Sequence, residues 1–111
     1  MDAVPQVVLE YVTSEGNNPF HDWLHRLRDI QARARVRVRV NRLRLGNFGD
    51  VKPVGGGVSE LRVPYGPGYR VYFGRLDGRV VLLLCGGDKS TQVQDIRTAK
   101  AHWMDYQRRL S

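Results

Sequence analysis

Three short runs of strand-forming residues, separated by turn signals, constrain the fold of this chain more than any other feature. The runs cover about Val58–Val63, Tyr69–Leu76 and Arg79–Cys85 and are rich in β-branched and aromatic residues. Between the last two runs stands Asp77-Gly78, a pair typical of a two-residue β-hairpin. The pattern therefore predicts three consecutive antiparallel strands.

The N-terminal part predicts one more strand and a short helix. The strand covers about Val4–Val12, where apolar and β-branched residues alternate loosely. The helix begins at Pro19 and ends at about Arg28, with Asn18 as its N-cap residue.

The segment Ala32–Val40 is ambiguous, because alanine or valine alternates strictly with arginine. A period of two by itself favours a strand slightly. However, Asp29 can cap a helix that starts here, and Leu45-Gly46 is typical of a helix end. These flanks, the length of the segment and a family resemblance described below favour a helix.

The remaining segments complete the predicted order. We expect a glycine-rich loop over Asn47–Gly57, a strand break at Gly86-Gly87, and a long helix that ends near Arg109. Thr91 and Gln94 have the spacing of a capping box at the start of this helix. The sequence thus predicts a single α+β domain over residues 1–111, of order β-α-α-β-β-β-α, whose small antiparallel sheet carries helices packed on one face.

The charge of the chain predicts an anionic partner. Lys and Arg number 18 against 11 Asp and Glu, which gives a formal net charge of +7, and 15 of the 18 are arginine. Such a balance fits nucleic acid, an acidic protein or a membrane surface, although codon usage in a GC-rich genome would also enrich arginine. The chain has a lone cysteine, Cys85, and shows neither a signal peptide nor a membrane-spanning run. We therefore expect a cytoplasmic protein that does not associate with a membrane.

Alternation along the predicted strands gathers polar residues on the open face of the sheet. Arg70 and Tyr72 are expected there, together with Glu60 and Arg62 of the preceding strand, while Lys89 lies at the rim. Arginine and lysine can stabilise the charge that develops when an RNA 2′-hydroxyl attacks its own phosphate, and lysine can act as acid or base. Arg62, Arg70 and Lys89 are therefore the candidate catalytic residues.

The other candidates have weaker support. Tyr72 can stack on a base, and Glu60 is a possible general base whose pKa the two arginines would lower. A solvated ion pair between Glu60 and an arginine would explain the same spacing without chemistry. His21 and His25 are one helical turn apart but have no third ligand nearby, so we expect no metal, and no cofactor motif is present.

Several segments resemble the RelE/ParE toxin superfamily, and most closely its HigB-like addiction module killer proteins. The matching segments are Leu45–Gly55, Glu60–Arg62, Tyr65–Phe73 and Leu83–Gln92. The resemblance implies a metal-independent endoribonuclease that cuts mRNA on the ribosome and inhibits translation. It also implies a cognate helix-turn-helix antitoxin. The toxin would bind operator DNA only as part of its complex with this antitoxin.

The resemblance also implies roles for single residues. Arg70 matches the arginine that contacts the scissile phosphate, and Arg62 and Lys89 fall at or near basic positions of the family. His102 and Tyr106 are candidates for the counterpart of a C-terminal catalytic tyrosine, and a family lysine is replaced here by Glu60. Two alternatives share this fold: a gyrase-inhibiting toxin of the ParE type, and a non-catalytic module that binds nucleic acid or protein.

Overall fold

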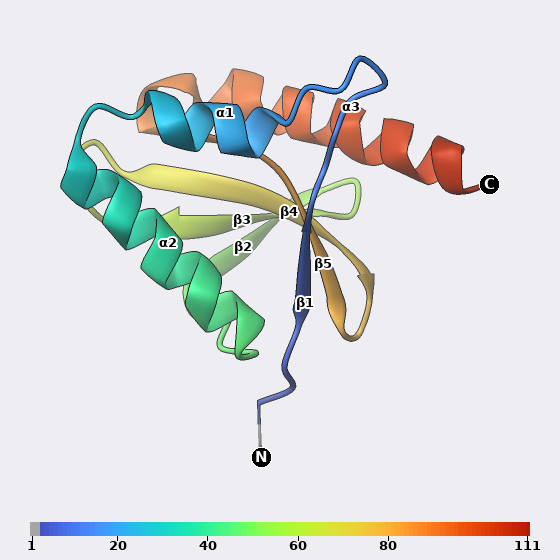
Figure 1. Cartoon of the computed structure of the whole chain (residues 1–111), viewed down its shortest axis with the longest axis horizontal. Helices are drawn as coiled ribbons and strands as arrows, with labels where there is room; N and C mark the ends of the chain where they lie inside the picture. The colour runs from blue at the N-terminus through green and yellow to red at the C-terminus, as the bar shows by residue number, and fades with distance from the viewer. Residues whose placement is uncertain (1–2) are drawn as a thin grey trace.

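The protein has three helices and one mixed β-sheet in the computed structural model, which describes residues 3–111 (Figure 1). The sheet has five strands in the order β1-β5-β4-β3-β2. The elements are β1 (Val7–Glu10), α1 (Pro19–Arg26), α2 (Ile30–Arg44), β2 (Val51–Gly55), β3 (Val58–Val63), β4 (Tyr69–Asp77), β5 (Val80–Asp88) and α3 (Gln92–Leu110).

The ambiguous arginine-rich segment is a helix, as the flanking residues predict. The side chain of Asp29 accepts hydrogen bonds from the backbone N–H groups of Gln31 and Ala32, and Gly46 follows the helix with φ of 88°. The predicted N-cap of α1 is also confirmed, because Asn18 accepts a hydrogen bond from the N–H of His21.

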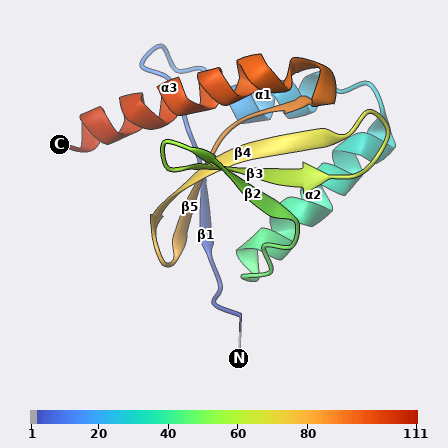
Figure 2. The same cartoon turned by 180° about the vertical axis from the view of Figure 1, so that it is seen from behind.

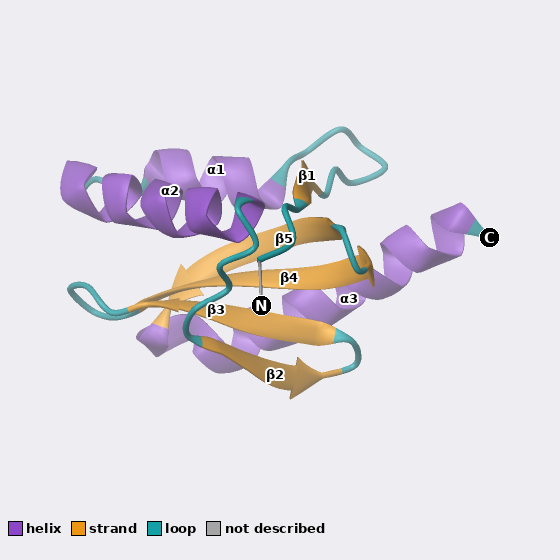
Figure 3. Cartoon of the chain, turned by 90° about the horizontal axis from the view of Figure 1, so that it is seen from below, coloured by secondary structure: helices purple, strands orange, loops and turns teal. Residues whose placement is uncertain are grey.

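The helices cover both faces of the sheet, so the prediction of one covered face is wrong. Helices α1 and α2 lie on one side, and α3 crosses the other (Figures 2 and 3). Leu83 and Phe73 pack in the first core, whereas Leu82 and Leu84 pack with Trp103 of α3 in the second. A run such as Val81–Leu84, apolar at every position, is typical of a strand that is buried on both faces.

Strand pairing also differs from the prediction of a wholly antiparallel sheet. β1 pairs with β5 in parallel, while β2, β3, β4 and β5 pair antiparallel to their neighbours. The segment expected to be a loop contains β2, which lies at the edge of the sheet. Pro53 lies in this strand, a position that an edge strand tolerates because one side of it needs no ladder hydrogen bonds.

After β4, the predicted strand break and the predicted capping box are wrong, although α3 does begin directly after Thr91. Gly86 and Gly87 lie within β5, where the absence of side chains lets Trp23 and Asp95 approach from opposite faces. The capping box of Thr91 does not form: its hydroxyl donates to the Asp95 carboxylate, 2.5 Å away, and Thr91 makes no side-chain cap. A short 3₁₀ turn, Lys89–Thr91, connects β5 to α3 instead.

Across residues 3–111, none of the helices combines the length and the apolar character that a bilayer crossing requires.

Candidate functional site

A fully buried carboxylate, that of Glu60 on β3, is the centre of the candidate site. Its Oε1 atom lies 3.1 Å from Nε of Arg62 and 3.5 Å from Nε of Arg70. Its Oε2 atom accepts hydrogen bonds from the hydroxyl of Tyr72 at 3.1 Å and from the amide of Gln92 at 2.9 Å. Four donors or cations from three elements of the fold thus compensate the buried charge, which would otherwise be costly.

Arg62 and Arg70 are direct cross-strand partners in β3 and β4. Like charges in such a pair destabilise a sheet, and the shared carboxylate of Glu60 offsets this repulsion. The side chain of Arg62 is 35% exposed and that of Arg70 is 13% exposed. Arg62 donates a hydrogen bond from Nε to Glu60, whereas Nε of Arg70 is held to the same carboxylate by an ion pair without a hydrogen bond.

Lys89 lies beside this arginine pair, in the turn that follows β5. The Nη1 atom of Arg70 donates to the carbonyl oxygen of Gly68 at 3.0 Å. A Cβ atom on Gly68 would lie 3.5 Å from that Nη1 and 4.0 Å from Cβ of Lys89, so the two side chains flank one glycine. Lys89 itself is exposed. The structure therefore brings the three predicted basic residues to the same end of β3, β4 and β5.

Tyr72 and Glu60 are not on an open surface, contrary to the prediction. Both are completely buried under α3, while Val71 and Phe73, which alternate with Tyr72 along β4, face the core on the other side of the sheet. Burial and the negative charge of Glu60 raise the pKa of Tyr72 well above its ordinary value. The Tyr72 ring has no free face for a base, so its role is to hold Glu60.

The lowered pKa expected for Glu60 is confirmed. Burial by itself raises the pKa, but hydrogen bonds from Gln92, Arg62 and Tyr72 and the charge of Arg70 outweigh it, so the pKa lies below its ordinary value. A buried carboxylate with both oxygens occupied has no place for a substrate proton. Glu60 is therefore placed to hold the side chains around it and has no free oxygen for a general base.

The pKa of Glu60 predicts a loss of stability in acid. The unfolded chain binds the proton of Glu60 first, so this group stabilises the fold above pH 4.5, its ordinary pKa, and loses that contribution as the pH falls through the lower folded value. We expect the free energy of unfolding, measured by urea titration at several pH values, to fall more steeply below pH 4.5 in wild type than in Glu60→Gln. Equal slopes would contradict the assignment.

His102 and Tyr106, the candidates for the counterpart of a catalytic tyrosine, lie away from the arginine pair. His102 follows Gln92 by ten residues on α3, which corresponds to about 15 Å along a helix. Its ring stacks on Tyr11 with centroids 4.6 Å apart, and burial lowers its pKa. Tyr106 packs against the core between α3 and the sheet. Helix geometry thus separates both residues from the arginine pair.

The two histidines of α1 stack on each other, with ring centroids 3.9 Å apart. Within residues 3–111, no group of three histidine, cysteine, aspartate or glutamate side chains is arranged to hold a metal ion. Cys85 is buried in the core, and burial raises the pKa of its thiol to about 12.

Sequence reasoning missed two residues of the site, Gln92 and Asp95. Gln92 begins α3 and donates to Glu60, and Asp95 lies over Gly87, the β5 residue in register with Arg70. Burial raises the pKa of Asp95, and the nearby Asp88 raises it further. The sequence pattern at the start of α3 predicts only a helix cap formed by Thr91 and Gln94. It therefore gives Gln92 and Asp95 no role in the site.

Comparison with known proteins places the chain in a family. No protein-family model matches it. An uncharacterized protein of Haemophilus influenzae is 52% identical over 81 residues, which cover 73% of this chain and 82% of that protein. The chain therefore belongs to the same protein family as this Haemophilus influenzae protein.

Proposed function

We propose that this protein is a toxin of the RelE/ParE type, a metal-independent endoribonuclease that cuts mRNA on the ribosome in the cytoplasm. The observation that carries the proposal is the register pair of Arg62 and Arg70, with Lys89 beside it. The resemblance of the Glu60–Arg62, Tyr65–Phe73 and Leu83–Gln92 segments to that superfamily supports it. The same resemblance supports a helix-turn-helix antitoxin as the partner. In this proposal the protein contacts operator DNA only when it is bound to that antitoxin.

The geometry suits a phosphodiester at the rim of the sheet. The Nε–H of Arg62 donates to Glu60, and Arg70 makes an ion pair with the same carboxylate and donates from Nη1 to Gly68, so both guanidinium groups are oriented before a substrate arrives. In the proposed reaction the RNA 2′-oxygen bonds to phosphorus and loses its proton to water, while the bond to the 5′-oxygen breaks. Arg62 and Arg70 stabilise the negative charge on phosphorus oxygens, and Lys89 donates a proton to the leaving 5′-oxygen.

Mapping of RNA 5′ ends after brief induction tests this function. We expect new ends with wild type, and a loss of about 100- to 1,000-fold in cleavage with Arg70→Ala, because one preorganised donor is removed. Arg79→Ala is the matched control, since this arginine is exposed in the β4–β5 hairpin. Thermal unfolding must show that each variant is folded.

Two outcomes would contradict the proposal. One is undiminished cleavage by a folded Arg70→Ala variant. The other is growth arrest by wild type without new RNA ends; DNA breaks with intact mRNA would then select a gyrase-inhibiting toxin.

A second candidate function, a non-catalytic binding module, is favoured by the charge balance of the site. Three carboxylates lie near the three basic side chains of the site, Arg62, Arg70 and Lys89. They are those of Glu60, Asp88 and Asp95, so the numbers of negative and positive charges are equal there. A structural ion-pair network of this kind needs no substrate. Harmless expression of the folded wild-type chain, with no new RNA ends, would select this function.

A further inference from the structure

Helix α2 has a second apolar stripe, which faces solvent. Its buried stripe consists of Ala32, Val36, Val40 and Leu43. On the opposite side Ile30 is 71% exposed, Val38 is 47% exposed and Leu45, at the C-cap, is 63% exposed. Together with the exposed Ala34 they form one line along the helix, which we call the outer ridge. Contiguous exposed apolar side chains of this kind are typical of an interaction surface.

Arginine rows flank the outer ridge on both sides. At 100° per residue, one row contains Arg35, Arg39 and Arg42, and the other contains Arg33, Arg37 and Arg44. The ion pairs found among residues 3–111 involve arginines of β3, β4 and α3 and none of these six. The outer face of α2 is therefore an apolar line between two rows of arginines, none of which forms an ion pair with a carboxylate of residues 3–111.

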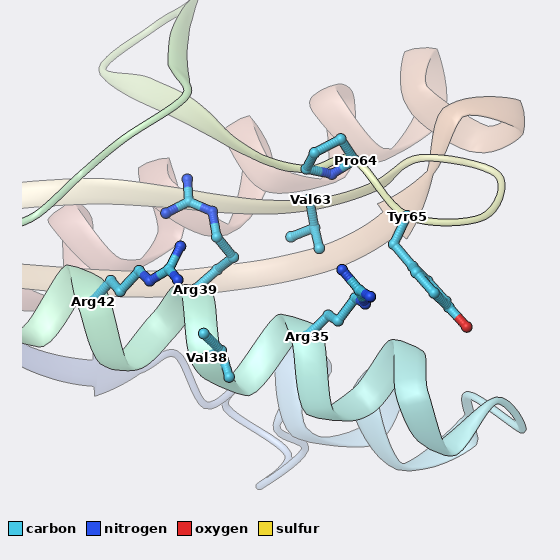
Figure 4. Close-up of a pocket in the computed structure, with 7 residues that line it drawn as sticks. All are labelled: Arg35, Val38, Arg39, Arg42, Val63, Pro64 and Tyr65. Carbon is cyan, nitrogen blue, oxygen red and sulfur yellow. The ribbon is translucent and has the colours of Figure 1, made fainter.

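A hollow lies next to the outer ridge, between α2 and the chain that follows β3 (Figure 4). Its volume is about 390 Å³. Arg35 lies over the ring of Tyr65, 4.7 Å from its centroid, and the Tyr65 hydroxyl donates to Asp29 at 3.0 Å. Arg39 is held by the carbonyl oxygen of Phe48 at 3.1 Å. Arg35, Arg39 and Tyr65, which line the hollow, are thus held in place by contacts within the protein.

We propose that the outer face of α2 docks an acidic amphipathic helix of a partner protein. Apolar side chains of such a helix would cover the outer ridge and enter the hollow, while its carboxylates would pair with the two arginine rows. RNA would leave the apolar ridge uncovered, and a lipid surface would not fill a concave hollow. The combination of ridge, hollow and flanking arginines therefore selects a protein segment.

This docking face is separate from the candidate site. Helix α2 covers the face of the sheet that carries Phe73 and Leu83, whereas Glu60 and Tyr72 lie on the face covered by α3 (Figure 3). The proposal accordingly depends on neither the nuclease function nor the Arg62–Arg70 pair, and its test needs no RNA cleavage.

A labelled synthetic peptide tests the proposal by fluorescence anisotropy. The peptide is an amphipathic helix with leucines on one face and glutamates on both sides of it, and its control is a scrambled peptide of equal composition. We expect wild type to bind the amphipathic peptide at least about tenfold more tightly, a difference of about 1.4 kcal/mol. Val38→Asp and the double variant Arg35→Glu, Arg42→Glu should each weaken binding by at least about tenfold.

Matched variants and competing ligands make the result decisive. The double variant Arg79→Glu, Arg97→Glu changes the net charge by the same amount as Arg35→Glu, Arg42→Glu, at exposed positions of the β4–β5 hairpin and of α3, and should leave peptide binding unchanged. Equal binding of both peptides, or unaltered binding by Val38→Asp, would overturn the proposal. So would a wild-type chain that ignores the peptide but binds oligo(U) RNA, or vesicles of phosphatidylglycerol and phosphatidylcholine, through these same residues.

Discussion

Glu60→Ala is expected to lower the free energy of unfolding by about 3–5 kcal/mol, the range for removal of one partner from a buried ion pair. The variant leaves Arg62 and Arg70 directly opposite each other without a counter-charge. It also leaves the Tyr72 hydroxyl, which is completely buried, without its acceptor. Urea denaturation at neutral pH, followed by tryptophan fluorescence, measures the change directly.

Substitution of single hydrogen-bond donors to Glu60 measures how much each of them contributes to the free energy of unfolding. Tyr72→Phe and Gln92→Ala each remove one hydrogen bond to a charged group, which is worth about 1.5–3 kcal/mol. Arg79→Ala, an exposed arginine of a hairpin, should stay within about 0.5 kcal/mol of wild type. A loss below about 1 kcal/mol in Glu60→Ala, typical of an exposed ion pair, would show that Glu60 is not the centre of a buried network.

Local signals were sufficient where the chain itself makes the deciding contacts. Asp29 and Gly46 delimit α2 although the alternation of alanine, valine and arginine favours a strand. Caps act within one turn, so their residues identify a helix end directly. The β4–β5 hairpin followed in the same way from its turn residues, although β5 extends through Gly86-Gly87 to Asp88.

Tertiary contacts decided what the sequence pattern left out. The parallel pairing of β1 with β5 joins segments more than seventy residues apart, and no local signal specifies it. Placement of α3 on the second face depends on Gly74 and Gly87, where Trp103 and Asp95 approach too closely for a side chain. A glycine in a strand indicates such an approach but does not name the residue that makes it.

The sequence was sufficient to predict which charged residues of the candidate site share a face of the sheet. It was not sufficient to predict that α3 buries part of that face. Strand alternation correctly placed Glu60, Arg62 and Arg70 on one face, since the register of β3 and β4 follows from short connections. The same alternation put Tyr72 on an open surface, which is wrong because α3 covers that face. A glutamate between strand residues does not reveal whether a helix will bury it.

The buried network and the proposed chemistry are connected through orientation. A guanidinium group held at Nε by a buried carboxylate loses little further freedom when it binds phosphate. Glu60 would thus support catalysis through Arg62 and Arg70 without contacting RNA. Glu60→Gln is accordingly expected to reduce cleavage as well as acid sensitivity.

Lys89→Ala is expected to reduce RNA cleavage by about 100- to 10,000-fold if Lys89 protonates the leaving 5′-oxygen, the range of general acid catalysis. Lys89 is exposed in the turn after β5, so its loss removes no buried contact and should leave the fold intact. Single-turnover cleavage of a short mRNA in programmed ribosomes measures the rate constant for the chemical step.

A substrate with sulfur in place of the leaving 5′-oxygen separates the proposed roles of Lys89 and Arg70. A thiolate leaves without a proton, so this substrate should restore most of the rate to Lys89→Ala. It should not rescue Arg70→Ala, because charge on the non-bridging phosphate oxygens still needs Arg70. Equal deficits of Lys89→Ala on both substrates would assign Lys89 to phosphate binding, and an undiminished rate on the natural substrate would remove it from the site.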